Sequence, residues 1–373
     1  MNHRIAMVTT AHPHDDVRIY HKEARTLLGA GWRVEIINPH FGGSDENGIR
    51  FSRVALPSGR LGRMLGARRA AIGALLQSRA DICVLHDPEL LPLLSDLRRT
   101  AIIAAYDAHE DLPAQLRAKP WIPPPMRGAA ALWGRRLLEK YLPMADGVLT
   151  ATDGIAQTLA GLNGRIRVVQ NRPTSADFAL FDAAGAAVTP LPNAVCYAGA
   201  LTGQRGLFRM IRCCHASGAA LLLAGRFEGD AARQKAEAMP EYSCVQYLGV
   251  LGRQGVAEAY AKCRAGLLLL DGTPAYRESE PIKLFEYLCA GLPVIASDFP
   301  HWRAAAPGPG VTFVELDKGD DTVIAAIRQA LAQPQTADIA DARQRFGFDA
   351  DAARLLRFFD ELEQTGGRRP STF

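Results

Sequence analysis

The segment ESEPIKLFEYLCAGLPVIASD, residues 278–298, gathers charged side chains at the start of a predicted helix. Pro281 suits the first turn of a helix, and Gly291 suits the left-handed position that follows one. A helix over residues 281–290 would carry unpaired amides and about half a positive charge at its N-terminus, where Lys283 adds a full charge. This combination is suited to binding a pyrophosphate.

Two carboxylates flank the predicted anion site. Glu286 lies too deep in the helix to cap it, and a carboxylate that accepts two hydrogen bonds suits the vicinal hydroxyls of a ribose. Glu278 lies upstream and suits the hydroxyls of a sugar on the other side of the phosphates. The pair would then bracket a nucleotide-sugar. The residues alone leave a second interpretation open, in which Glu278 and Glu280 cap the helix and Glu286 is a surface charge.

Short apolar runs alternate with helix-like segments along most of the chain, which predicts an α/β fold with parallel sheets covered by helices. In the first half these runs are residues 4–9, 33–37, 82–86, 101–106, 147–150 and 166–170. Residues 171–193, rich in Pro, Ala and Asn, are predicted to link two Rossmann-like domains, because the alternation restarts at residue 194. Ligands of such sheets bind beyond the carboxyl ends of the strands, so the polar residues that follow each strand are candidates.

The composition of the 373 residues excludes several classes of protein. The chain is 48% hydrophobic with a net charge of +4, and no apolar run approaches the ~20 residues of a membrane span. The N-terminal MNHRIAMVTT lacks the apolar core of a signal peptide. The seven cysteines contain no CxxC pair, which predicts reduced thiols with neither a disulfide framework nor structural zinc.

Glu278 and Glu286, with seven residues between them, resemble the E-x7-E motif of retaining glycosyltransferases of family 4. The AGLPVIASD run that follows is similar to the Gly-x-Pro run of that family, in the branch that builds bacterial surface polysaccharides and glycolipids. RTLLGAGWRVEII, YDAHEDLP and YAGALTGQRGLFRMI extend the likeness over nearly the whole chain. The resemblance implies the GT-B fold, in which two Rossmann-like domains with parallel sheets face each other across a cleft.

The resemblance also implies that the two domains bind different substrates. Residues 1–172 would bind the acceptor, and residues 173–348 would bind the nucleotide-sugar. A C-terminal helix within 349–373, whose apolar residues recur at helical spacing, would cross back to the first domain.

Carried over to this sequence, the resemblance implies roles for individual residues. Glu278 would hold the transferred sugar and His109 would face that sugar near the reacting carbon, which makes both catalytic candidates. The positions implied for donor binding are Arg205, Lys283 and the amides of Leu284 and Phe285 at the diphosphate, Glu286 at the ribose, and the backbone of Val250 and Leu251 at the base.

The sequence departs from the family pattern at the phosphate site. Gly199–Ala200 lacks the arginine that many members have, and Ser279 and Pro281 replace the usual glycines between the two glutamates. Pro281 offers no N–H, so Lys283 is expected to carry more of the phosphate charge.

The first loop, AHPHDDVR, also departs from the family's Gly-Gly pair, so acceptor contacts cannot be copied from the family. The predicted acceptor-binding residues are Asp16 and Arg18 in this loop and His86 and Asp87 at the end of the strand run at 82–86. An alternative for Asp87 is that it caps the following helix. HPHDD could suggest a metal, but its spacing matches no zinc pattern, so no metal site is predicted.

The implied activity is transfer of a hexosyl group from a nucleoside-diphosphate sugar to a hydroxyl of a glycan or lipid-linked acceptor, with retention and without a metal. No cofactor is expected, because the nucleotide-sugar is a substrate. Two alternatives stay open: another enzyme on the same fold, such as a nucleotide-sugar epimerase or sugar phosphorylase, and a non-catalytic nucleotide-sugar-binding subunit.

Two basic stretches in the first half bear on where the protein acts. Residues 60–80 and 113–138 are rich in arginine, and the second also carries Trp121, Met126 and Trp133. Basic residues with tryptophan suit the headgroup layer of an anionic membrane, whereas a solvated helix face with buried aromatics is the alternative. No nucleic-acid recognition motif accompanies the charge. The expected location is the cytoplasm. If the basic stretches bind lipid headgroups, the protein would also bind peripherally to the inner face of the cell membrane.

Overall fold

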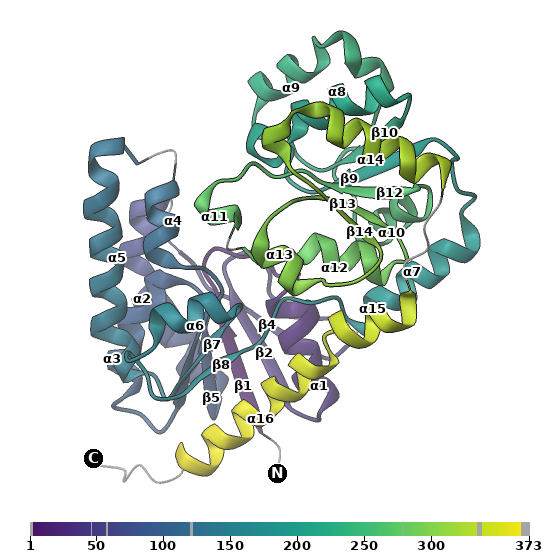
Figure 1. Cartoon of the computed structure of the whole chain (residues 1–373). Coiled ribbons are helices and arrows are strands. Elements are labelled where there is room, and N and C mark those ends of the chain that lie inside the picture. The colour runs from purple at the N-terminus through teal and green to yellow at the C-terminus, as the bar shows by residue number, and fades with distance from the viewer. Residues whose placement is uncertain are drawn as a thin grey trace. The chain divides into compact units, whose positions relative to one another are not determined.

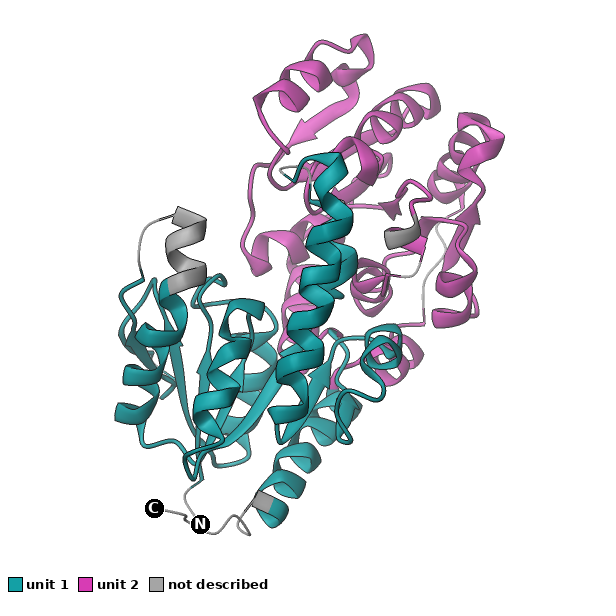
Figure 2. Cartoon of the chain, turned by 90° about the vertical axis from the view of Figure 1, so that its left-hand side faces the viewer, with its two compact units in different colours: residues 1–171, 349–373 teal, residues 172–348 magenta. Residues whose placement is uncertain are grey.

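A computed structural model of the chain describes residues 3–45, 47–56, 59–119, 122–277, 279–333 and 338–366 (Figure 1). The chain divides into two compact units, one of Met1–Asn171 with Asp349–Phe373 and one of Arg172–Phe348 (Figure 2). Each unit is a sheet of parallel strands that alternate with helices along the chain. The predicted α/β fold with two parallel sheets is therefore confirmed.

The sheet of the first unit has the strand order β3-β4-β2-β1-β5-β6-β7-β8, and within the described residues β3 alone runs antiparallel to its neighbour. Its strands are β1 Arg4–Val8, β2 Arg33–Asn38, β3 Gly43–Ser44, β4 Arg50–Arg53, β5 Ile82–Leu85, β6 Ile103–Ala108, β7 Gly147–Thr150 and β8 Ile166–Val168. Ala6 and Val8 of β1 belong to one core, while Ile5 and Met7 are buried on the opposite face. Burial on both faces explains why the central strands are continuous apolar runs.

Helices cover both faces of this sheet, with α2, α3 and α5 on one side and α1 and α16 on the other (Figure 1). One short element, η1, is a π-helix, and η2, η3 and η4 are single 3₁₀ segments. The bounds are η1 Ile19–Ala24, α1 Arg25–Gly29, α2 Gly59–Ser78, η2 Pro88–Leu93, α3 Leu94–Leu97, α4 Leu112–Ala118, η3 Pro124–Met126, α5 Arg127–Tyr141, η4 Leu142–Met144, α6 Asp153–Leu159 and α16 Asp349–Gly366.

The C-terminal helix α16 packs on the first unit through its apolar face. Phe358, Phe359 and Leu362 are fully buried, and α16 contacts α1, η1, β6 and β8. Gly147 at the start of β7 makes room for it, because a Cβ there would lie 2.7 Å from the Phe358 ring. The apolar face that the residue spacing of the tail predicted is thus buried against one face of the sheet of the first unit.

The sheet of the second unit has the order β11-β10-β9-β12-β13-β14, and every pairing among its described strands is parallel. Its strands are β9 Ala194–Ala198, β10 Ala220–Ala224, β11 Val245–Tyr247, β12 Ala265–Leu268, β13 Val294–Ser297 and β14 Val311–Val314. Its helices are α7 Ser175–Ala187, η5 Gly203–Arg205, α8 Leu207–Ser217, α9 Asp230–Glu237, η6 Pro240–Cys244, α10 Arg253–Ala261, α11 Pro274–Arg277, α12 Ile282–Cys289, α13 Pro300–Ala305, η7 Leu316–Lys318, α14 Asp320–Ala332 and α15 Ile339–Phe346. Within the described residues of both units, no helix combines the length and the apolar character needed to cross a membrane.

The predicted linker at 171–193 is wrong over most of its length, because Ser175–Ala187 forms helix α7. Thr174 and Asp177 form a capping box, in which each side chain accepts a hydrogen bond from the other residue's backbone amide. The alanines that follow are strong helix formers. The Pro and Asn residues that suggested a linker lie outside the helix at its two ends.

Candidate functional site

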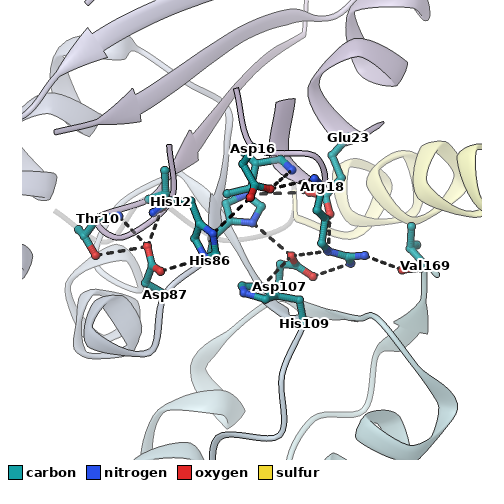
Figure 3. Close-up of polar contacts among 12 residues, drawn as sticks. Thr10, His12, Asp16, Arg18, Glu23, His86, Asp87, Asp107, His109 and Val169 are labelled. Atoms are coloured by element: carbon teal, nitrogen blue, oxygen red, sulfur yellow. Dashed lines mark hydrogen bonds and ion pairs between the residues drawn. The ribbon is translucent and has the colours of Figure 1, made fainter. Parts of the chain in front are cut away.

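Polar side chains gather at the carboxyl ends of three neighbouring strands of the first unit (Figure 3). His86 and Asp87 follow β5, Asp107 and His109 lie at the end of β6, and the loop of residues 9–18 follows β1. Because β1, β5 and β6 are adjacent and parallel, these ends share one edge of the sheet, where ligands of such sheets bind. The fold therefore brings the predicted acceptor residues close to His109.

Arg18 forms a bidentate ion pair with Asp107 inside the first unit. Its Nε and Nη2 donate to the two carboxylate oxygens at 2.8 and 2.7 Å, and Nη1 donates to the Val169 carbonyl oxygen at 2.8 Å. Burial alone would raise the pKa of Asp107, but the charge of Arg18 and hydrogen bonds from Arg18 and two histidines hold that pKa well below its usual value. The Arg18 side chain is 7% exposed, so the contact with an acceptor predicted for it is not available in this conformation.

Asp107 also lies next to two histidines. Nδ1 of His86 lies 3.2 Å and Nδ1 of His109 lies 3.4 Å from Asp107 Oδ2. An ionised carboxylate only accepts hydrogen bonds, so Asp107 favours the form of each ring that carries a proton on Nδ1.

The two histidines differ in access to solvent. His86 is fully buried, and burial lowers its pKa, so the acceptor contact predicted for His86 is also unavailable here. His109 keeps 20% of its side chain exposed. Burial lowers the pKa of His109, but Asp107 outweighs burial and raises it overall. His109 is therefore the histidine of this pair that can reach a ligand.

Asp87 binds the loop after β1 instead of capping the helix that follows it. Its Oδ2 accepts hydrogen bonds from Thr9 Oγ1 at 2.8 Å and from the Thr10 amide at 2.6 Å. The side chain makes no capping hydrogen bond to η2, and the residue is buried. Both interpretations of Asp87 from the sequence, helix cap and acceptor contact, are therefore replaced by a third role, which is to hold this loop against β5.

His12 bridges two carboxylates in the same loop region. Its Nδ1 lies 3.4 Å from Asp16 Oδ2, and its Nε2 lies 3.3 Å from Asp87 Oδ1. Hydrogen bonds to Asp16 and Asp87 raise the pKa of His12 to about 10, so the ring is an imidazolium at neutral pH. The His12 ring lies edge-on to His109 with ring centroids 4.9 Å apart. The network thus has a partly exposed part, which consists of His12, Asp16 and His109. Its buried part, the base, consists of Arg18, His86, Asp87 and Asp107.

Glu23 completes the buried base of the network. It lies in the π-helix η1, with Oε1 3.1 Å from Arg18 Nε and Oε2 3.9 Å from His86 Nε2. Burial raises the pKa of Glu23 well above its usual value, which favours the protonated carboxyl. Ligand atoms of Glu23, His86 and Asp107 lie within 4.8 Å of one another, a spacing that a metal ion could use. Arg18 already pairs with both oxygens of Asp107, so we assign the cluster to buried ion pairing.

In the second unit, α12 is the helix predicted within residues 278–298, and we call its N-terminal turn the helix mouth. Lys283 Nζ lies 2.6 Å from Glu286 Oε2, and the Tyr260 hydroxyl donates to the same oxygen at 3.0 Å. Lys283 and Glu286 are each partly exposed, so both can reach a ligand once their ion pair opens. Glu278 lies outside the described residues, and its role stays a prediction.

The first turn of α12 uses two of the amides predicted to bind phosphate. Leu284 and Phe285 donate their backbone N–H groups to the Pro281 carbonyl oxygen, at 2.9 and 3.3 Å. Those amides are unavailable while this turn stays closed, which corrects the prediction. The positive charge at the helix mouth therefore comes from Lys283 and the helix dipole.

Arg205 lies in the short turn after β9, next to a glycine that the backbone requires. Gly206 has φ +77°, and a Cβ there would lie 2.1 Å from the Leu269 carbonyl oxygen. The Arg205 Cζ lies 5.9 Å from the centroid of the Tyr276 ring. Burial raises the pKa of Tyr197, whereas the positive charges of Arg205 and Lys283 act to lower it.

The predicted base site follows β11. Val250 is 66% exposed and Leu251 is half-buried. The carbonyl oxygen of the preceding Gly249 accepts a hydrogen bond from the Gly225 amide at 2.7 Å, which ties this turn to the end of β10. The turn is thus held at the carboxyl edge of the second sheet, and base binding by Val250 and Leu251 stays a prediction.

Sequence analysis missed Asp107, Glu23 and Tyr260. Asp107 had a usable signal, because it is an acid inside the apolar strand run that ends at His109. Glu23 had none, since an acid on a helix of the first half is normally solvated. Tyr260 looks like one more apolar residue of a helix, and only the fold places its hydroxyl beside Glu286.

Part of the first unit matches a known family of domains. Residues 17–174 match the family model described as glycosyl transferase 4-like domain. No curated protein matched the sequence of the chain.

Solved structures share the fold over nearly the full length of the chain. The sucrose-phosphate synthase of Thermosynechococcus elongatus has 17% identity and a TM-score of 0.75, over 97% of this chain and 100% of the other. HepE of Anabaena in complex with UDP and glucose has 14% identity and a TM-score of 0.67, over 96% and 100%. WaaG, a glycosyltransferase involved in lipopolysaccharide biosynthesis, has 16% identity and a TM-score of 0.63, over 97% and 98%. The chain therefore has the GT-B fold of these glycosyltransferases, and its residues 17–174 match the glycosyl transferase 4-like domain.

Proposed function

We propose that this glycosyltransferase moves a hexosyl group from a nucleoside-diphosphate sugar to an acceptor hydroxyl with retention at the anomeric carbon. The observation that supports this best is the Lys283–Glu286 pair at the N-terminal end of α12, which follows β12 and the short helix α11. Glu286 is proposed to hold the ribose, and Glu278 the hydroxyls of the transferred sugar. Lys283 and Arg205 supply positive charge for the diphosphate.

The difficult step is breaking the bond between the anomeric carbon and the diphosphate oxygen. Negative charge grows on the leaving diphosphate, and fixed cations aimed at it stabilise that charge. The acceptor oxygen bonds to the anomeric carbon on the same face, and its proton passes to the leaving phosphate oxygen. No protein nucleophile is then required. Metal independence is proposed because Lys283, Arg205 and the dipole of α12 would supply positive charge for the diphosphate.

His109 is the proposed contact of the first unit with the donor sugar. Asp107 holds its Nδ1, which leaves Nε2 for a sugar hydroxyl. Asp16 remains the proposed acceptor contact, because it stays partly exposed. Arg18, His86 and Asp87 are proposed to position these groups from below, since their polar atoms are buried or paired with protein.

The donor and acceptor can be narrowed by chemical class. HepE has been solved with UDP and glucose, so a uridine-diphosphate hexose is the first donor to test. WaaG acts in lipopolysaccharide biosynthesis, which agrees with a glycan or lipid-linked acceptor and a role in surface polysaccharide or glycolipid synthesis. The alternatives are an epimerase, which needs no acceptor, and a non-catalytic subunit that binds the nucleotide-sugar only.

A panel of nucleotide-sugars tests the proposal directly. UDP-glucose, UDP-galactose, ADP-glucose and GDP-mannose are compared by thermal unfolding, and a true donor at 100 times its Kd should stabilise the protein by about 2.7 kcal/mol. The best binder is then incubated with and without a lipid-linked saccharide, and products are read by NMR. Transfer only with the acceptor supports the proposal, isomerisation of the donor alone supports an epimerase, and stabilisation by none of the four contradicts the assigned donor site.

Helix α5 supports a second proposal, peripheral binding to an anionic membrane. Leu132 and Trp133 are exposed on it, and Met126 is exposed just before it. Arg135, Arg136 and Lys140 are exposed on the same helix with Glu139 as its one acid. Part of the predicted basic region, including Trp121 and the side chains of Arg60 and Arg63, lies outside the described residues.

Vesicle flotation tests this proposal, because it measures binding of the protein to membranes. The protein should float with vesicles that contain phosphatidylglycerol, and binding should fall as salt rises from about 50 to about 300 mM, because the Debye length shortens. Trp133→Ser should weaken flotation, because it removes the exposed apolar anchor. Leu191→Ser removes an exposed apolar side chain of the second unit and should leave flotation unchanged. Equal flotation with neutral vesicles would contradict an electrostatic contact.

A further inference from the structure

The Tyr260 hydroxyl lies between the two charged groups of the proposed donor site. On α10, it is 3.0 Å from Glu286 Oε2 and 3.3 Å from Lys283 Nζ. An ammonium only donates and a carboxylate only accepts, so the hydroxyl accepts from Lys283 and donates to Glu286. Burial raises the pKa of Tyr260 well above its usual value, so the hydroxyl keeps the proton that it donates.

Donor binding must open the Lys283–Glu286 pair. With Nζ 2.6 Å from Oε2, the two charges neutralise each other in the unliganded protein. If Lys283 turns to the diphosphate and Glu286 to the ribose, Glu286 loses its charged partner. Among the hydrogen bonds recorded for the described part of the chain, the Tyr260 hydroxyl is then the remaining donor to Oε2, and Oε1 is left for the ribose.

The Tyr260 ring is held rigidly by its surroundings. Tyr260 is 2% exposed, and its ring packs edge-on against Tyr287 with centroids 4.8 Å apart. Phe181 of α7 packs on it with centroids 6.0 Å apart. A side chain packed in this way keeps its rotamer, so its hydroxyl stays in place when Lys283 moves.

We propose that Tyr260 is a positioning residue, which holds the Glu286 carboxylate in the orientation that binds the ribose diol of the donor. This inference rests on the proposed function, in which Glu286 contacts the ribose. The Tyr260 hydroxyl fixes one carboxylate oxygen and so presents the other to the diol, while Lys283 is released to the phosphates.

The chain offers a matched control in Tyr287. Tyr287 is also fully buried and lies against Tyr260, but its hydroxyl accepts a hydrogen bond from the Ala198 amide at 3.4 Å instead of binding Glu286. Tyr260→Phe and Tyr287→Phe each remove one buried hydroxyl and keep the packed ring. A difference between them therefore reports the contact with Glu286 and not the loss of a buried hydroxyl.

The experiment compares affinities for a ribonucleoside diphosphate and its 2′,3′-dideoxy counterpart by calorimetry. UDP, ADP and GDP are screened first, and the tightest is used with its dideoxy form. Tyr260→Phe should weaken binding of the ribonucleotide about tenfold and leave the dideoxy form unchanged, because a hydrogen bond to a charged group is lost. Tyr287→Phe should change neither affinity. The ratio of two affinities on one sample cancels any loss of folded protein.

Glu286→Gln separates failure of this inference from failure of the proposed function. If Glu286→Gln removes the preference for ribose while Tyr260→Phe retains it, Tyr260 has no positioning role and the donor site stands. Equal weakening of both nucleotides by Tyr260→Phe also overturns the positioning role. If the wild type shows no preference for ribose, or Glu286→Gln retains that preference, the ribose assignment fails and the role of Tyr260 fails with it.

Discussion

Lys283→Met is expected to lower kcat/KM for sugar transfer by about 10²–10³-fold. Lys283 is the charged group at the mouth of α12, the neighbouring amides of Leu284 and Phe285 are used by Pro281, and the sequence has alanine where many members have a phosphate arginine. Removing it leaves developing negative charge on the diphosphate opposed mainly by Arg205 and the helix dipole. Steady-state kinetics with the donor found in the nucleotide-sugar panel measure the loss.

Lys318→Met is the matched control for that variant. Lys318 pairs with Glu315 at 2.9 Å with the same i,i+3 spacing, but both side chains are largely exposed and far from any proposed site in sequence. Its loss should leave kcat/KM within about twofold, because surface ion pairs contribute little. A Lys283→Met enzyme with the kinetics of Lys318→Met would refute the phosphate assignment.

Asp107→Asn is expected to lower the free energy of unfolding of the first unit by about 3–5 kcal/mol. The substitution removes the charge that a buried, bidentate Arg18 faces, and it leaves that guanidinium beside Glu23 and two histidines. Glu23 is then the nearest acid to Arg18, and burial disfavours its ionisation, so the buried charge is poorly compensated where water cannot solvate it. Urea unfolding followed by tryptophan fluorescence measures the change.

Asp96→Asn is the control, because Arg68 and Asp96 make the same bidentate contact at 2.6 and 2.7 Å on the surface of the same unit. Their side chains are 47% and 31% exposed, against 7% and 0% for Arg18 and Asp107. The expected loss is at most about 1 kcal/mol. Equal losses for the two variants would show that burial of the Arg18–Asp107 pair does not set its contribution.

The pH dependence of the Asp107→Asn effect has a definite sign. The folded-state pKa of Asp107 is held well below its usual value, so its contribution is present above the unfolded pKa of about 3.9 and is lost as the pH falls. The difference in unfolding free energy between the wild type and Asp107→Asn should therefore be constant above about pH 5 and shrink below about pH 4. A difference that grows toward acid pH would contradict the ion-pair account.

The contact between Lys283 and Glu286 could be predicted from the sequence because its signals are local. Pro281, Lys283 and Glu286 lie within one turn and a half of one helix, so helix geometry alone places Lys283 next to Glu286. The same local reasoning predicted that the amides of Leu284 and Phe285 bind phosphate, and the structure shows them bonded to Pro281 instead. A carbonyl that closes the first turn competes for those amides, and the residue types do not show whether that turn is closed.

The acceptor side could be predicted only as a list of polar residues after strands. Arg18, His86 and Asp87 were identified, but the sequence does not say which of them stays exposed. Arg18 is separated from Asp107 by 89 positions, and His12 from Asp87 by 75. Pairings between residues so far apart in the sequence depend on the order of β1, β5 and β6 in the sheet, and local sequence patterns do not specify that order.

By itself, the sequence determined the alternation of strands and helices, the helix mouth with Lys283 and Glu286, and the likeness to family 4 glycosyltransferases, because periodicity and short motifs act within a few residues. Tertiary structure alone decided that Asp107 and Glu23 are buried partners of Arg18, that α7 replaces a linker, and that the hydroxyl of Tyr260 meets Glu286. These are contacts between elements far apart in the chain. Their energies depend on burial, which only the packed fold defines.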